Sequence, residues 1–166
     1  MGKLKREAHM FYIKAPKATN YYLVGKDIDD MSVEMNGSYE QKQDITGQSS
    51  VSDSGYQPQV GVDPYYANPD DEIYEFLKDL ALNRKSGDDS KAKYLEVLVE
   101  DPVASSHEAW QEDCKIEIVS YGGDTSGLQI VYNVWPDGNR QEGTVTMNDK
   151  VPTFTAKNSV SSVSNE

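Results

Sequence analysis

The sequence predicts a mostly β (α+β) domain: a β-sandwich of two sheets with one flanking helix and an extended polar hairpin or loop. Short runs that alternate apolar and polar residues recur along the chain, which is typical of half-buried strands. Only residues 70–84 carry apolar residues at helical spacing. Residues 37–54 contain few large apolar side chains, so they cannot contribute much to a core. At 166 residues the chain is long enough for one domain and short for two.

The N-terminal part is expected to form an arm followed by two strands. Residues 1–20 are polar and basic without a clear period, which predicts an arm outside the single domain of residues 21–155. A short apolar run over residues 21–24 predicts a first strand, and alternation over residues 31–35 predicts a second. Residues 156–166 are rich in Ser, Val and Asn and are expected to form a loose C-terminal tail.

Residues 37–54 are expected to form either a mobile loop or an extended hairpin that projects from the body and meets another chain. Tyrosine combines a large apolar area with a polar tip and therefore suits subunit interfaces, and the chain contains 11 tyrosines. Scattered surface positions are the alternative interpretation of these tyrosines. The candidate inter-subunit residues are Tyr39, Ile45, Val51, Tyr65 and Tyr66.

Residues 55–63 predict a strand that Pro64 closes, and the helix over residues 70–84 follows. Asn68 or Asp70 can cap this helix, and acidic residues in its first turn favour the positive end of the helix dipole. Its apolar residues fall at i, i+4, i+7 and i+8, which gives one stripe: Ile73, Leu77, Leu80 and Ala81.

The C-terminal half is expected to consist of strands. A Pro-Asp-Gly-Asn sequence at residues 136–139 predicts a reverse turn. Residues 101–111 show no alternation and are expected to be irregular. Alternating patterns predict strands at residues 95–99, 114–118, 128–134, 144–147 and 151–155.

The charge of the chain is acidic and unevenly spread. Residues 1–20 contain five basic residues and one acidic residue, a net charge of +4. The rest of the chain contains 11 basic and 27 acidic residues, a net charge of −16. Nucleic acid is bound through Lys and Arg side chains that neutralise phosphates, so an acidic body argues against a protein that wraps nucleic acid.

The sequence carries no arrangement of residues that supports catalysis. Cys114 is the single cysteine, which argues against a disulfide and a thiolate metal site. His9 and His107 have no second ligand at metal spacing. The glycine-rich residues 122–127 lack the Lys and the following helix of a phosphate-binding loop, so a hairpin connection explains them better. We therefore expect no enzymatic activity, no catalytic or metal-binding residues and no cofactor.

No membrane-spanning or secretion segment is expected. The chain has no run of 18 consecutive apolar residues, and the apolar run after its basic start is too short for a signal peptide. The protein is therefore expected to be made in a reducing cytoplasm and to remain soluble until it assembles.

Two segments together resemble the tail tube proteins of long-tailed bacteriophages and of phage-like particles from Gram-positive bacteria. One is residues 55–67, which lead into the predicted helix, and the other is residues 120–130, which lead into the turn at residues 136–138. The likeness is one of pattern and order and covers roughly residues 20–155.

The resemblance implies a tail-tube-like β-sandwich that is shared with the tube protein of the type VI secretion system. Six subunits would close into a ring whose inner sheets join around a channel. The rings would stack through the extended loop and the terminal arms, and DNA would pass through the channel during genome ejection without specific binding. The implied partners are further copies of the chain and other tail proteins such as the tape measure and the tail terminator. The implied location is the tail of a virion assembled in the host cytoplasm.

Carboxylates on the channel wall would repel the phosphates of DNA and leave no adhesive sites. Within half-buried strands, the polar residues that face away from the core are the candidates, namely Glu34 and Glu117. Glu40 and Asp44 on the polar excursion are weaker candidates, since that element can lie between rings. The alternative is that the acidic charge only keeps the free subunit soluble.

Two other functions remain open from the sequence. One is a monomeric or low-order binding module, such as a capsid decoration protein. The other is a type VI-like secretion tube protein on the same fold. The state of assembly of the purified chain separates the first of these from a tube subunit.

Overall fold

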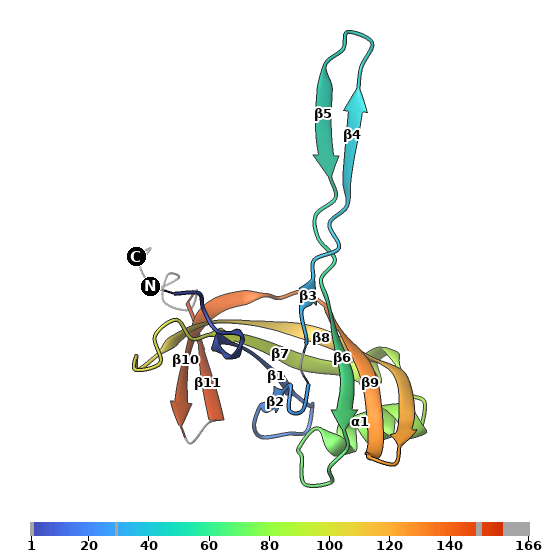
Figure 1. Ribbon diagram of the computed structural model, residues 1–166, viewed down its shortest axis with the longest axis vertical. Coiled ribbons are helices and arrows are strands. Elements are labelled where there is room, and N and C mark those ends of the chain that lie inside the picture. The colour runs from blue at the N-terminus through green and yellow to red at the C-terminus, as the bar shows by residue number, and fades with distance from the viewer. Residues whose placement is uncertain (1, 29, 149–150, 158–166) are drawn as a thin grey trace.

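The computed structural model describes residues 2–28, 30–148 and 151–157, and these residues form a mostly β fold with one α-helix. A curled sheet of nine strands and helix α1 make up the body, and a separate two-stranded sheet projects from it (Figure 1). The predicted fold class, a β-sandwich with one flanking helix, is confirmed. The elements are η1 (Arg6–Ala8), β1 (His9–Lys14), β2 (Tyr22–Val24), β3 (Val33–Glu34), β4 (Tyr39–Gln43), β5 (Ser49–Asp53), β6 (Gln59–Tyr66), α1 (Tyr74–Leu82), η2 (Gly87–Ser90), β7 (Lys91–Leu98), β8 (His107–Asp124), β9 (Gly127–Pro136), β10 (Gln141–Asn148) and β11 (Val151–Ala156).

Strand β8 organises the main sheet because it has different neighbours along its two halves. The strand order is β2-β1-β7-β8-β9-β6-β3, and each pair in it is antiparallel. The first half of β8 lies between β7 and β10, whereas its second half pairs with β9 from Cys114 onward. Since β9 and β10 both pair with the same side of β8, the sheet divides there, and β10 and β11 form one end of the body (Figure 1).

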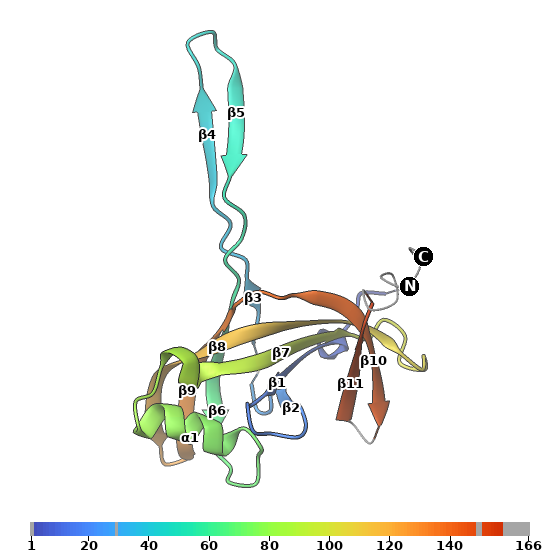
Figure 2. The same ribbon diagram turned by 180° about the vertical axis from the view of Figure 1, so that it is seen from behind.

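The central strands bury side chains on both faces, which produces two apolar cores. On one face the strands pack against α1, and the members of this core include Phe11, Tyr94 and Tyr132. Helix α1 covers this face at the end of the body that lies away from the projecting hairpin (Figure 2). The core on the other face lies where the curled sheet brings β10–β11 over β1 and β7, and its buried members are Tyr12, Leu95, Val97, Ala109 and Val145.

The prediction of an N-terminal arm is wrong for residues 9–14. These residues form β1, which pairs with β2 on one side and β7 on the other. Phe11, Tyr12 and Ile13 are all buried, because β1 is covered on both faces. A strand buried on both faces shows a continuous apolar run in place of alternation, and so its sequence lacks the expected period.

Two strand boundaries also differ from the prediction. Strand β8 already begins at His107, within the stretch expected to be irregular. The buried residue at the start of this strand is the small Ala109, and so the sequence lacks a clear apolar alternation there. Strand β6 continues past Pro64, where its register with β9 shifts between Val62 and Tyr65. Beyond Val60 this strand has no described neighbour opposite β9, and an edge position tolerates a residue without a backbone N–H.

The predicted helix is confirmed but is shorter than expected. Its apolar stripe is buried against the sheet, with Ile73 just before the first turn and Leu77 inside it. The residues before it form turns, in which the Asn68 side chain accepts a hydrogen bond from the backbone of Asp70 at 3.0 Å. The helix ends before Arg84, whose φ of 55° lies in the left-handed region and interrupts the helical hydrogen bonds.

Residues 37–54 form a projecting hairpin, one of the two predicted alternatives. Strands β4 and β5 pair over five residues each and rise away from the body in both views (Figures 1 and 2). All side chains of both strands are exposed. At the tip, the Asp44 carboxylate accepts hydrogen bonds from the backbone of Thr46 and Gln48 at 2.9 and 3.1 Å, which closes the turn.

Candidate functional site

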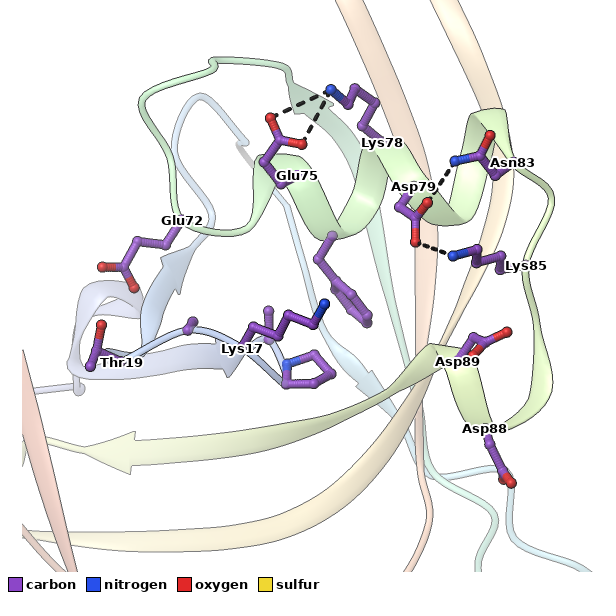
Figure 3. Close-up of a pocket in the computed structure, with 14 residues that line it drawn as sticks. Lys17, Thr19, Glu72, Glu75, Lys78, Asp79, Asn83, Lys85, Asp88 and Asp89 are labelled. Carbon is purple, nitrogen blue, oxygen red and sulfur yellow. Dashed lines mark hydrogen bonds and ion pairs between the residues drawn. The ribbon is translucent and has the colours of Figure 1, made fainter.

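No group of three or more His, Cys, Asp or Glu side chains within the described part of the chain is placed to hold a metal ion. No described helix is both long and apolar enough to cross a membrane. An open groove of about 1010 Å³ lies between residues 15–19 and α1 (Figure 3). Two of its lysines are paired with acidic residues of α1, since Lys78 lies 3.2 Å from Glu75 and Lys85 lies 2.9 Å from Asp79.

The hairpin is braced where it leaves the body. The hydroxyl oxygens of Tyr39 and Tyr56 lie 3.0 Å apart. Their rings belong to the two chains at the hairpin base, with centroids 6.2 Å apart and an interplanar angle of 56°. A Cβ atom at Gly37 would lie 3.0 Å from the Tyr39 ring and 3.1 Å from the Tyr56 ring, so only glycine fits without displacing them. The backbone N–H of Ser54 donates to the carbonyl oxygen of Ser38 at 2.8 Å. These contacts join the two strands at the base of the hairpin to each other.

The hairpin also offers unused binding capacity. Ile45 at the tip and Val51 on β5 are exposed, and so is most of Tyr39 at the base. Within the described part of the chain the two strands pair only with each other, so the outer backbone edge of each strand is open there. An open strand edge flanked by apolar side chains is a template for pairing with another chain.

The main sheet also has open edges, and two of them lie at opposite ends of the body (Figure 1). Strand β3 pairs with β6 only at Gln59 and Val60, which leaves the edge of residues 61–66 without a described neighbour opposite β9. Strand β11 pairs with β10, and residues 151–155 have no other strand beside them among the described residues. Uncovered strand edges are a liability in a lone domain and are removed when copies join edge to edge.

Four of the five predicted inter-subunit residues lie on the surface. Tyr39, Ile45 and Val51 belong to the hairpin, and Tyr66 lies on the open edge of β6. Tyr65 is a correction, because it is only 5% exposed. Its hydroxyl donates to Asp71 at 2.8 Å, and burial raises its pKa above the ordinary value. Tyr65 is therefore a core residue that fixes the segment before α1.

The four predicted channel residues do not form one cluster. Glu34 lies at the base of the hairpin, and Glu40 and Asp44 lie on the hairpin itself. Glu117 lies on β8 in the body, where it accepts hydrogen bonds from Asn133 at 3.0 Å and from Trp135 at 2.9 Å.

These two donors give Glu117 a fixed negative charge. They hold the pKa of its carboxyl group below the usual value, the Asn133 amide contributing most. The side chain faces away from the core, since its neighbours Ile116 and Ile118 pack against the apolar core on the α1 side. Glu34 also lies on a strand of the main sheet, and its neighbour Val33 packs against the same core, so Glu34 and Glu117 both face away from the α1 side.

A buried ion network was missed at the level of sequence. Glu96 on β7 and Glu112 on β8 are both buried, and Arg140 forms ion pairs with both of them. His9 on β1 lies 2.8 Å from Glu96, so the network joins three strands and the turn before β10. The sequence does place a Glu among apolar neighbours at residues 94–98. From the alternating pattern alone, this position is predicted to face outward.

The environment of the two carboxylates differs. Burial raises the pKa of Glu112, and the charge of Arg140 offsets this only in part. Burial also disfavours ionised Glu96, but its contacts with His9 and Arg140 outweigh that effect and lower its pKa. Arg140 therefore compensates two charges that the fold removes from water.

Replacing Arg140 with Met is expected to lower the free energy of unfolding by about 2–4 kcal/mol. Breaking a fully buried ion pair costs about 3–5 kcal/mol, and the range is reduced here because the guanidinium side chain is 42% exposed. Without the arginine, burial raises the pKa of both carboxyl groups, so the loss is present at neutral pH and shrinks as falling pH protonates them. Urea unfolding at neutral and mildly acidic pH measures both effects.

Lys91→Met is the matched control for this prediction. Its ion pair with Asp88 at 3.3 Å is exposed, so its removal should cost less than about 1 kcal/mol. Equal losses in the two variants, or a loss for Arg140→Met that does not change with pH, would contradict the assigned role of Arg140.

The fold and these surfaces define a class: a mostly β sandwich with one helix, a braced projecting hairpin and open strand edges at both ends of its main sheet. Comparison with protein-family models finds no match for this chain. Comparison with curated protein sequences also finds no match.

Proposed function

We propose that this chain is a structural subunit whose copies join into rings, and that the rings stack into the tail tube of a long-tailed phage or a phage-like particle. The observation that carries the proposal is the hairpin. It is ordered and braced at its base, yet its strands bury nothing against their own subunit. Such an element gains its binding energy only from another molecule.

The open edges of β6 and β11 supply the contact within a ring. They differ in sequence and lie at opposite ends of the body, so the edge of one copy meets a different edge of the next. A contact of this head-to-tail kind closes into a ring when the rotation between copies allows it. The resemblance to tail tube proteins implies six copies per ring.

Sedimentation velocity over a range of concentrations tests this proposal. Copies that join through strand edges and hairpins should give a monomer at low concentration and large particles above a threshold, with few species between. A chain that remains monomeric at every concentration would overturn the proposal and would favour the binding module. A type VI-like secretion tube would assemble in the same way, so sedimentation separates a tube subunit from a binding module and does not separate the two kinds of tube.

The charge of the channel gives a second test. Tubes of a Glu34→Lys/Glu117→Lys variant are expected to retain duplex DNA at low ionic strength and to release it as salt screens the attraction. Tubes of the native chain should retain little at either salt concentration. Co-sedimentation of tubes with labelled duplex DNA measures the difference.

Glu75→Lys is the matched control for the channel, because Glu75 lies on the outer side of α1, across the core from Glu117. This variant should behave like the native chain when the DNA enters from the tube end. Intact Glu34→Lys/Glu117→Lys tubes that retain no DNA at low salt would remove these two residues from the channel wall.

A further inference from the structure

A second groove, of about 620 Å³, lies beside the distal half of β8. Strand β7 pairs with β8 only as far as Lys115, where its own first residue, Lys91, lies opposite. From residue 116 onward the edge of β8 on that side has no strand beside it among the described residues, and residues 84–90 form the other wall of the groove. The groove is therefore an open strand edge with space beside it for one more strand.

The side chains of this groove are mostly apolar or basic, and Glu117 is the one carboxylate among the residues that line it. Val119 is 55% exposed, and Tyr121 and Trp135 are also exposed although they are large and apolar. Arg84 and Lys115 have no ion-pair partner within the described chain. These two unpaired basic side chains outnumber the carboxylate of Glu117 and leave the groove with a local positive charge, which is unusual on a body whose net charge is strongly negative.

We infer that this groove is the docking site for the β4–β5 hairpin of a second copy of the chain. The hairpin supplies open strand edges, and pairing of one of them with the edge of β8 would continue the sheet. Residues 39–53 contain three acidic residues and one basic residue, a net charge of −2 that complements Arg84 and Lys115. The exposed Val51 on the hairpin matches the exposed Val119 in the groove.

The placement of the two elements sets the direction of stacking. The hairpin leaves the body at one end of the long axis, whereas α1 and the β8–β9 turn lie at the other end (Figures 1 and 2). A hairpin cannot fold back to the groove of its own subunit, but a copy displaced along this axis brings its hairpin to the groove of the next. This docking site rests on the proposed function and identifies the acceptor through which rings stack.

Reciprocal charge reversal tests the electrostatic attraction between the hairpin and the groove. An Arg84→Glu/Lys115→Glu variant makes the groove acidic, and a Glu40→Lys/Asp53→Lys variant makes the hairpin basic. Each variant alone should raise the threshold concentration for assembly by about tenfold or more, because like charges then face each other. The variant with all four changes restores the attraction and should assemble near the native threshold. Failure of the fourfold variant to recover, with each double variant folded by circular dichroism, would overturn the docking site.

Cysteine cross-linking tests the contact itself. The native Cys114 is buried, so it adds no background. A Val51→Cys/Val119→Cys variant is expected to form a ladder of disulfide-linked oligomers on mild oxidation. Gln41 on β4 lies opposite Val51 on β5. A Gln41→Cys/Val119→Cys variant therefore detects docking in which β4, and not β5, lies against β8. Val103 is exposed in the β7–β8 loop, away from the groove. Val51→Cys/Val103→Cys is therefore the matched control, and it is expected to form no ladder.

The outcomes separate the two proposals. A ladder from either Val119→Cys variant supports the docking site. Large particles by sedimentation without a ladder from either variant would overturn the docking site and leave the proposed function standing. A native chain that never assembles would overturn both.

Discussion

Replacing residues 40–51 with a short Gly/Ser turn is expected to leave the body folded and to abolish the growth of tubes. The exchange keeps the base of the hairpin, including the hydrogen bond between Ser38 and Ser54. It removes only residues that are exposed in the subunit, so the unfolding midpoint should change little. Negative-stain microscopy and sedimentation of the purified variant measure assembly, and urea unfolding measures stability.

The matched control for this variant replaces residues 101–105, a second exposed loop on the body, with a turn of the same composition. This control should assemble like the native chain. Normal tubes from the shortened hairpin would show that the hairpin does not connect rings. Loss of assembly in both variants would indicate a general sensitivity of the body to loop exchange.

The second large effect is expected at Leu77. This residue is fully buried where α1 packs on the sheet, and Leu77→Ala should lower the free energy of unfolding by about 2–5 kcal/mol through lost burial and a residual cavity. Leu82 lies on the same helix but is 57% exposed, so Leu82→Ala should cost less than about 1 kcal/mol. Urea unfolding of both variants at equal concentration makes the comparison.

A loss for Leu77→Ala no greater than that for Leu82→Ala would show that α1 does not pack on the sheet in the free subunit. The stripe of the helix would then be available for contacts between subunits. Because both substitutions remove the same atoms from the same helix, differences in helix propensity cancel in this comparison.

The elements that could be predicted are those that bury only one face, because their apolar residues then recur at the spacing of a strand or a helix. Strand β9 alternates through Ile130, Tyr132 and Val134, which are all buried, and the helical stripe with Leu77 behaves in the same way. The hairpin was predictable as one of two alternatives, since its polarity excludes a role in the core. Local turn residues do not determine whether such a segment pairs with itself, so the choice between loop and hairpin needed the structure.

The elements that were missed depend on contacts between residues distant in sequence. Strand β1 has no alternation because β10–β11 cover one of its faces while α1 and its surroundings cover the other. Glu96 occupies an inward position that is made tolerable by His9 and Arg140, which are both distant in sequence. Tyr65 is buried, and its hydroxyl group donates a hydrogen bond to Asp71, a contact that the local sequence does not indicate. No local pattern contains this information.

Residues 1, 29, 149–150 and 158–166 lie outside the described residues, and most of the predicted C-terminal tail falls among them. The predicted N-terminal arm is now restricted to the residues before β1. Of these, Arg6 donates to the backbone carbonyl oxygens of His9 and Met31, which ties the start of the chain to the body.

Electron microscopy of the purified native chain above its assembly threshold tests the central claim most directly. The claim is that copies of this subunit build a hollow tube through strand edges and projecting hairpins. We expect stacked rings of one diameter with a central channel, joined by density that leaves each ring at one end and enters the next beside the distal half of β8. Monomers only, or solid particles without a channel, would contradict it.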